Sequence, residues 1–190
     1  AFTGVWARGT LTTSGRGDIT LLGRSGTLSG SALDDVGVSV VGLVQSTLAG
    51  ATAGDIFITG VSNTGGAAGS AEGVTLAGAA PGGQIVSAGG NVTITATGSL
   101  GVGPGNHGVL SVPGDITTGT GNITITGIAR SGAASGVYLW VGGDSISTTS
   151  GAISVTGTGI GGGADIWLGG GTSISSSSRS VTLTGDSMDL

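Results

Sequence analysis

The sequence predicts an all-β protein: a three-sided, right-handed parallel β-helix, or β-solenoid, of about six coils. Two observations predict it. Glycine contributes 44 of the 190 residues and serine plus threonine contribute 50, a composition that disfavours helices and supplies turns and strands. A short strand-like motif also returns six times along the chain, with glycine-rich corners between its copies.

The recurring motif alternates an apolar residue with Thr or Ser, which is the period of two expected of a β-strand. Its first apolar residues are Ile19, Ile56, Val92, Ile123, Ile153 and Val181. Successive copies are separated by 37, 36, 31, 30 and 28 residues. We therefore expect coils that start near residues 18, 55, 91, 122, 152 and 180.

Two further strands are expected between consecutive copies of the motif. The second strand follows a glycine corner, as in Gly73-Val74-Thr75-Leu76 and Gly136-Val137-Tyr138-Leu139. The third is shorter, as in Asp115-Ile116-Thr117, and its copy in the second coil, near Leu48, is poorly defined. Three short strands in each 28–37 residues predict a three-sided solenoid, and the crossover rule favours a right-handed one.

Residues 1–190 are expected to form a single solenoid. The chain starts just before a second strand and stops just after a copy of the motif. A coil running from Val181 through residues 1–17 of a following copy would span 28 residues to the next Ile19, as the preceding coil does. The sequence therefore predicts a segment of a longer solenoid, or copies that stack head to tail into a filament.

One corner of the solenoid is expected to carry a stack of Asx side chains. An Asp or Asn precedes each of the first four copies of the motif, at Asp18, Asp55, Asn91 and Asn122. Asx side chains accept hydrogen bonds from the backbone of turns, so we interpret this stack as structural.

Neither catalytic nor metal-ligating residues are expected, and no cofactor. The chain lacks Cys and has one His, His107, which falls in an expected solvent-exposed turn. The only close acidic pairs, Asp34–Asp35 and Asp186–Asp189, lie in expected loops. Carbohydrate-cleaving sites need clustered carboxylates, so an enzyme acting on polysaccharide is the least favoured alternative.

Aromatic residues are expected to gather on the face formed by the second strands. If Val5, Val137 and Ile166 point inward, the alternation of strand side chains turns their neighbours outward. These neighbours are Trp6, Tyr138, Trp140 and Trp167, which include every Trp and the single Tyr. Exposed aromatic rings of this kind are typical of a lateral protein contact or of a platform for sugar rings.

The outward positions of the recurring motif carry hydroxyl groups in its last four copies. Together with Ser154, they are Thr93, Thr95, Thr124, Thr126, Thr156, Thr182 and Thr184. This Thr face resembles the flat Thr-x-Thr array of solenoid ice-binding proteins, although Leu22 and Phe57 interrupt it in the first two copies. The resemblance implies ice binding as one alternative function, while the strand preference of Thr explains the pattern without a ligand.

Charge and hydropathy exclude other classes of protein. Five Arg, no Lys and a net charge of −5 argue against a nucleic-acid partner. The longest nearly apolar stretch, 36–44, is far shorter than the roughly 20 residues of a membrane-spanning helix, so no membrane insertion is expected.

The repeated pattern GxITITG, GVxL and SIS resembles the large exported β-helix proteins of the filamentous haemagglutinin and autotransporter-passenger type, particularly their "beta strand repeat" surface proteins. This resemblance covers nearly the whole chain and implies an extracellular location on a bacterial cell surface. It implies a non-enzymatic fibre segment or an adhesin, with further copies of the chain as partners and carbohydrate as a candidate ligand. It supplies no catalytic residues.

Overall fold

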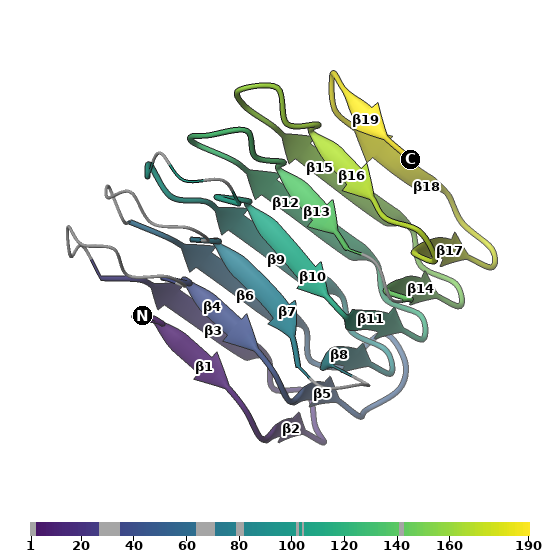
Figure 1. The fold of residues 1–190 in the computed structure, drawn as a ribbon. Helices are drawn as coiled ribbons and strands as arrows, with labels where there is room; N and C mark the ends of the chain where they lie inside the picture. Colours follow the sequence, from purple (N-terminus) through teal and green to yellow (C-terminus); the bar gives the residue numbers. More distant parts are fainter. Residues whose placement is uncertain are drawn as a thin grey trace.

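The structure, a computed structural model, describes residues 3–26, 35–63, 71–78, 82–101, 103, 105–140 and 143–190. These residues form 19 β-strands and no helix. The strands are arranged in three parallel sheets, and the chain visits the sheets in turn, so that each circuit adds one strand to each. The fold is a three-sided parallel β-helix of about six coils, as predicted (Figure 1).

We name the sheets A, B and C in the order in which the chain enters them. Sheet A contains β1 (Val5–Ala7), β4 (Val38–Val40), β7 (Val74–Ala77), β10 (Val109–Val112), β13 (Val137–Leu139), β16 (Ile166–Leu168) and β19 (Met188–Asp189). Sheet B contains β2 (Thr10–Thr13), β5 (Leu43–Ser46), β8 (Gly83–Ser87), β11 (Gly114–Thr118), β14 (Ser145–Thr148) and β17 (Ser173–Ser176). Sheet C contains β3 (Ile19–Arg24), β6 (Ile56–Val61), β9 (Val92–Thr97), β12 (Ile123–Ile128), β15 (Ile153–Thr158) and β18 (Val181–Thr184).

Residues of the same kind lie above one another in successive coils, because neighbouring strands pair in a constant register. In sheet C, for example, Ile123 pairs with Val92 on one side and with Ile153 on the other. In sheet B, Ile116 pairs with Ile85 and Ile146. These inward columns of Ile, Val and Leu fill the interior, where removal of their apolar surface from water stabilises the fold.

Glycine at the corners lets backbone segments approach each other closely, both within one coil and between neighbouring coils. At Gly127, at the end of sheet C, an added Cβ would collide with the carbonyl oxygen of Gly136. At Gly42, between sheets A and B, it would collide with the carbonyl oxygen of Gly9 in the coil below. The abundance of glycine in the sequence thus follows from backbone-to-backbone packing at the corners.

Two strands differ from the sequence-based expectation. The third strand of the second coil is β5 (Leu43–Ser46), not a strand near Leu48, because the chain turns sharply at Gly42 and enters sheet B at once. The C-terminal residues Met188 and Asp189 form β19, which pairs with Ile166 and Trp167 of β16. Sheet A therefore has seven strands, whereas sheets B and C have six each.

Candidate functional site: an aromatic hollow on sheet A

The four aromatic residues singled out from the sequence all lie on the outer face of sheet A or directly beside it. One outward column contains, in order, Trp6, Ser39, Thr75, Leu110, Tyr138, Trp167 and Asp189. Trp140 follows directly after β13. The structure brings Tyr138, Trp140 and Trp167 together, whereas Trp6 lies at the far end of the column, where the guanidinium carbon of Arg8 is 4.6 Å from its ring centroid.

His107 belongs to the same cluster, although the sequence predicted an exposed turn. Its imidazole stacks on Tyr138 with ring centroids 4.3 Å apart, and Tyr138 stacks on Trp167 at 4.4 Å. We call these three rings the aromatic stack. The prediction was wrong because the ring's neighbours come from the following coil, so His107 is only 9% exposed.

The geometry of a parallel sheet explains the stack. Successive strands are about 4.8 Å apart, close to the distance between the centroids of two offset-stacked aromatic rings. The planes of His107 and Tyr138 are inclined by 14°, and those of Tyr138 and Trp167 by 17°. Both faces of the Tyr138 ring are therefore covered by neighbouring rings. Trp140 is different, since its ring is tilted by 51° to Tyr138 and remains 43% exposed.

Hydrogen bonding and burial determine the protonation of His107. The backbone amide of Ser135 donates to its Nδ1 at 3.0 Å, so the neutral ring carries its proton on Nε2. Burial lowers the pKa of His107 to about 4. The imidazole is therefore neutral at pH 7 and offers an N–H donor.

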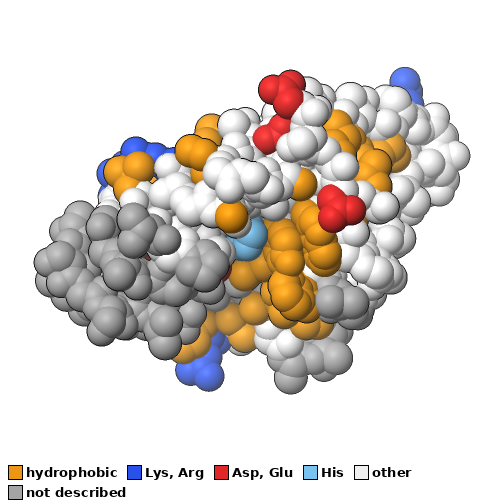
Figure 2. All heavy atoms as spheres, turned by 45° about the horizontal axis from the view of Figure 1, so that its top comes forward, with side chains coloured by type: hydrophobic (Ala, Val, Ile, Leu, Met, Phe, Trp, Pro, Cys, Tyr) orange, Lys and Arg blue, Asp and Glu red, His pale blue; other side chains and the backbone are white. Residues whose placement is uncertain are grey.

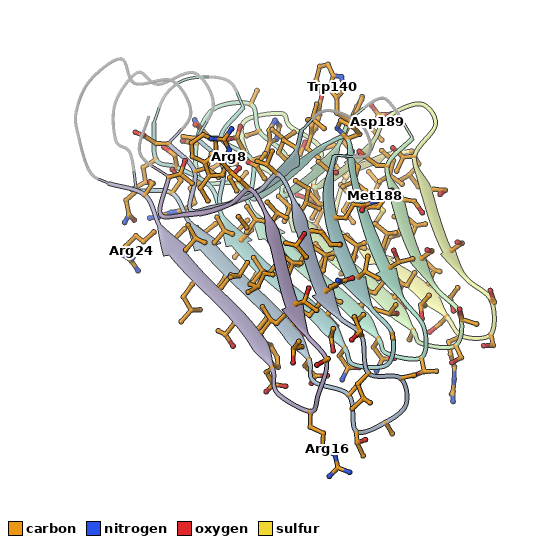
Figure 3. The ribbon with its side chains drawn as sticks, turned by 90° about the horizontal axis from the view of Figure 1, so that it is seen from below. Arg8, Arg16, Arg24, Trp140, Met188 and Asp189 are labelled. Atoms are coloured by element: carbon orange, nitrogen blue, oxygen red, sulfur yellow. The ribbon has the colours of Figure 1, made fainter. Side chains whose placement is uncertain are left out.

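The aromatic side chains line a hollow of about 710 Å³. Strands β10, β13 and β16 contribute Leu110, Tyr138 and Trp167, and residues 133–135 and 162–164 approach it from the corners that precede β13 and β16. Glu72, which is buried, and the exposed Asp189 also line it. Figure 2 shows the single histidine, in pale blue, at one end of a band of hydrophobic side chains. In Figure 3, Trp140 and Asp189 lie at the same side of the molecule.

The Asx side chains lie at the corner before sheet C and form a hydrogen-bonded ladder. Asp18 Oδ1 accepts from the amide of Asp55 at 2.8 Å, and Asp55 Oδ1 accepts from the amide of Asn91 at 2.7 Å. Asn91 Oδ1 and Asn122 Oδ1 accept in the same way from the amides of Asn122 and Ala152. Each side chain thus satisfies a backbone amide of the next coil, which is a structural role.

The threonines of the Thr face lie side by side on the outer surface of sheet C. Its two outward columns contain Thr93, Thr124, Ser154 and Thr182 in one and Thr95, Thr126, Thr156 and Thr184 in the other. Phe57 and Leu22, which are 36% and 68% exposed, continue these columns toward the N-terminus. The continuous hydroxyl surface therefore covers four coils, and in the first two coils Thr59 and Thr20 share the columns with these apolar side chains.

Acidic groups do not form a metal site in the part of the chain that the structure describes. No group of three or more His, Asp or Glu residues suited to a metal ion occurs there. Asp34 lies outside the described residues, and Asp35 is buried, not solvated as expected. Asp165 accepts hydrogen bonds from the backbone amides of Gly159, Ser187 and Asp186, which lower its pKa, with Gly159 having the largest effect.

Comparisons of the chain with protein families, with curated proteins and with solved structures found no match. Within the described residues there is no helix long and apolar enough to cross a membrane.

Proposed function

We propose that this chain is a non-enzymatic structural protein, a β-solenoid subunit or segment of a long extracellular fibre in which copies stack head to tail. The observation that carries the proposal is the state of the two end coils. Inward residues of the interior coils, such as Ile85 and Ile123, are fully buried. Residues of the same columns in the end coils are open to water, with Leu11 41% and Val181 40% exposed.

The two ends match each other in sheet C. Residues of β18 that point inward, Val181 and Leu183, correspond to Ile19 and Leu21 of β3. A β3 strand of a following copy can therefore pair with β18 and continue both inward columns. Open edges of parallel strands are templates for such pairing, and a heterologous contact of this kind propagates into a filament.

Sheet A places one condition on this stacking. Strand β19 occupies the edge of β16 on which β1 of a following copy would have to pair, because sheets B and C have no corresponding extra strand. The stacked form therefore requires β19 to leave that edge. β19 has only two residues, and Met188 is 38% exposed, so little buried surface opposes its displacement.

The resemblance to filamentous haemagglutinin-type and autotransporter-passenger proteins supports the same proposal and adds an extracellular, cell-surface location. The low content of charged residues, 8%, is also favourable for association. The mechanical role follows from hydrogen-bonded ladders that run along the fibre axis and share load among three sheets.

Electron microscopy of the purified chain tests the proposal, and unbranched filaments are the expected result. The amide of Ile153 donates to Ser180, toward the next coil, so the register places the Val181 amide on the open side of β18. Val181→Pro removes this edge donor at the first position of a strand, where proline is tolerated, and should leave folded monomers. Val181→Ala keeps the amide and should still assemble. Wild-type chain that stays monomeric at high concentration would refute the proposal.

A further inference from the structure

We propose that the hollow on sheet A binds a neutral oligosaccharide, with one pyranose ring resting against Trp140. This site lies on the side of the solenoid, over β10, β13 and β16, and it is argued for the unstacked chain, in which Asp189 of β19 lines it. The proposal rests on the size of the hollow, on the arrangement of its aromatic rings and on the sign of its charged groups.

The dimensions of the hollow suit a sugar. Its volume of about 710 Å³ falls within the range of roughly 300–1,000 Å³ that is usual for small-molecule sites. Its floor is the outer face of β10, β13 and β16, and the corner segments before β13 and β16 rise beside it. A rigid parallel sheet therefore holds the lining side chains in place.

The aromatic rings divide into a support and a contact surface. Tyr138 is enclosed between His107 and Trp167 at centroid distances of 4.3 and 4.4 Å, so the aromatic stack presents mainly ring edges to the hollow. Trp140 lies 5.3 Å from Tyr138, centroid to centroid, and is 43% exposed. An exposed indole fixed against a rigid stack provides the apolar surface on which the C–H groups of a pyranose pack.

The polar groups of the hollow suit hydroxyl groups. Asp189 is exposed and contributes a carboxylate that accepts hydrogen bonds, whereas Glu72 is buried in the wall of the hollow. His107 contributes an Nε2–H donor, because its Nδ1 accepts from Ser135. A sugar hydroxyl both donates and accepts, so such a mixed set of groups can orient it.

The charge of the residues that line the hollow favours neutral over anionic saccharides. The residues described around the hollow include two acidic residues, of which Asp189 is exposed, and neither Arg nor Lys. Sulfated, sialylated or uronic-acid chains would be repelled, and nucleic-acid phosphates likewise. A neutral hexose polymer carries no charge that the acidic residues of the hollow would repel. We therefore propose this class of ligand.

Intrinsic tryptophan fluorescence, titrated with four neutral hexaoses, tests the proposal. The probes are cellohexaose, maltohexaose, mannohexaose and chitohexaose, with tetramethylammonium chloride as a cationic comparison. We expect a saturable change with at least one hexaose for the wild type. Trp140→Ala should weaken binding roughly tenfold or more, and Trp140→Phe, which retains a ring, should recover part of it.

Trp6→Ala is the matched control, since Trp6 of the single chain is exposed on the same sheet but lies outside the hollow. Binding is measured in the Val181→Pro background, because stacking would bring Trp6 of a following copy beside Trp167. Trp6→Ala should bind like the wild type. The proposal is overturned if none of the four hexaoses binds, if Trp6→Ala and Trp140→Ala weaken binding equally, or if only tetramethylammonium saturates the signal. Filaments of Trp140→Ala are expected to persist under the electron microscope. A variant that loses sugar binding but still forms filaments therefore tests the sugar site without testing the fibre proposal.

Discussion

Among single residues, His107 is the one whose burial has the clearest consequence for pH. Its ring is enclosed by Tyr138 and by backbone of the next coil, and burial lowers its pKa to about 4 in the folded chain. An exposed histidine of the unfolded chain titrates near pH 6.5. Between these two values the unfolded state binds a proton that the folded state does not, so acid favours unfolding.

We therefore expect the wild type to lose on the order of 3 kcal/mol of stability through His107 as the pH falls from 7 to 4. His107→Gln, which can still accept from the Ser135 amide, should lack this component. Urea unfolding of both proteins at pH 7 and pH 4 measures it. Asp165, with a lowered pKa, adds to the acid loss, and Asp144, whose pKa burial raises, opposes it. Asp165 and Asp144 are present in both the wild type and His107→Gln, so their effects cancel in the comparison. If the two proteins lose the same stability between pH 7 and pH 4, the expectation for His107 is wrong.

The residues of the hollow were predictable from the sequence only where strand alternation decides the direction of a side chain. Trp6, Tyr138 and Trp167 point outward because Val5, Val137 and Ile166 point inward. The positions of His107 and Glu72 depend on the path of corner segments and on neighbours about 30 residues away. Local patterns contain no such information.

Among the structural elements, the corner before sheet C depends most directly on individual side chains. The Asx ladder runs from Asp18 to Asn122, and each rung satisfies one amide of the next coil. The ladder ends at Ala152, which occupies the position of the Asx residues in its coil but has no side-chain acceptor. The backbone amide of Ser180, at the same position in the next coil, therefore has no such partner from Ala152.

Two substitutions at this corner should have opposite effects. Asn91→Ala removes the acceptor for the Asn122 amide and the side-chain bond to Asp55, and should cost about 1 kcal/mol. Ala152→Asn extends the ladder by placing an acceptor before the Ser180 amide, and should stabilise the fold by about 0.5–1 kcal/mol. Thermal unfolding compares the two with the wild type. A neutral result for both would show that water satisfies these amides equally well.

Strands whose motif recurs from coil to coil were predictable. β9 and β15 alternate apolar residues with Thr or Ser along their whole length, and β13 follows the glycine corner that marks each second strand. β5 was obscured because Gly42 sits within a nearly continuous apolar run, so the corner and the strand start could not be separated. β19 carries no recognisable motif and forms because the edge of β16 is free to pair with it.

At the scale of the whole molecule, charge is distributed unevenly along the axis. Arg8, Arg16 and Arg24 all belong to the first coil, around which Figure 3 shows them. The last coil contains Asp186 and Asp189, together with Arg179. β18 ends at Thr184. If the register of β15 with β18 and of β3 with β6 continued two residues further, Arg24 of a following copy would lie near Asp186. We therefore expect the proposed head-to-tail contact to bring these opposite charges together.

This pairing leads to a charge-reversal test of the filament. Asp186→Arg places two arginines opposite each other and should slow assembly roughly five- to tenfold, because an exposed pair contributes up to about 1 kcal/mol and its reversal adds repulsion. The double variant Asp186→Arg with Arg24→Asp restores opposite charges and should assemble at close to the wild-type rate. Light scattering follows the growth of filaments, and electron microscopy confirms that the product is filamentous.

High salt should reduce the difference in assembly rate between the single variant and the wild type, because exposed charges are screened. If the double variant assembles as slowly as the single one, the two residues do not meet, and copies stack in another register.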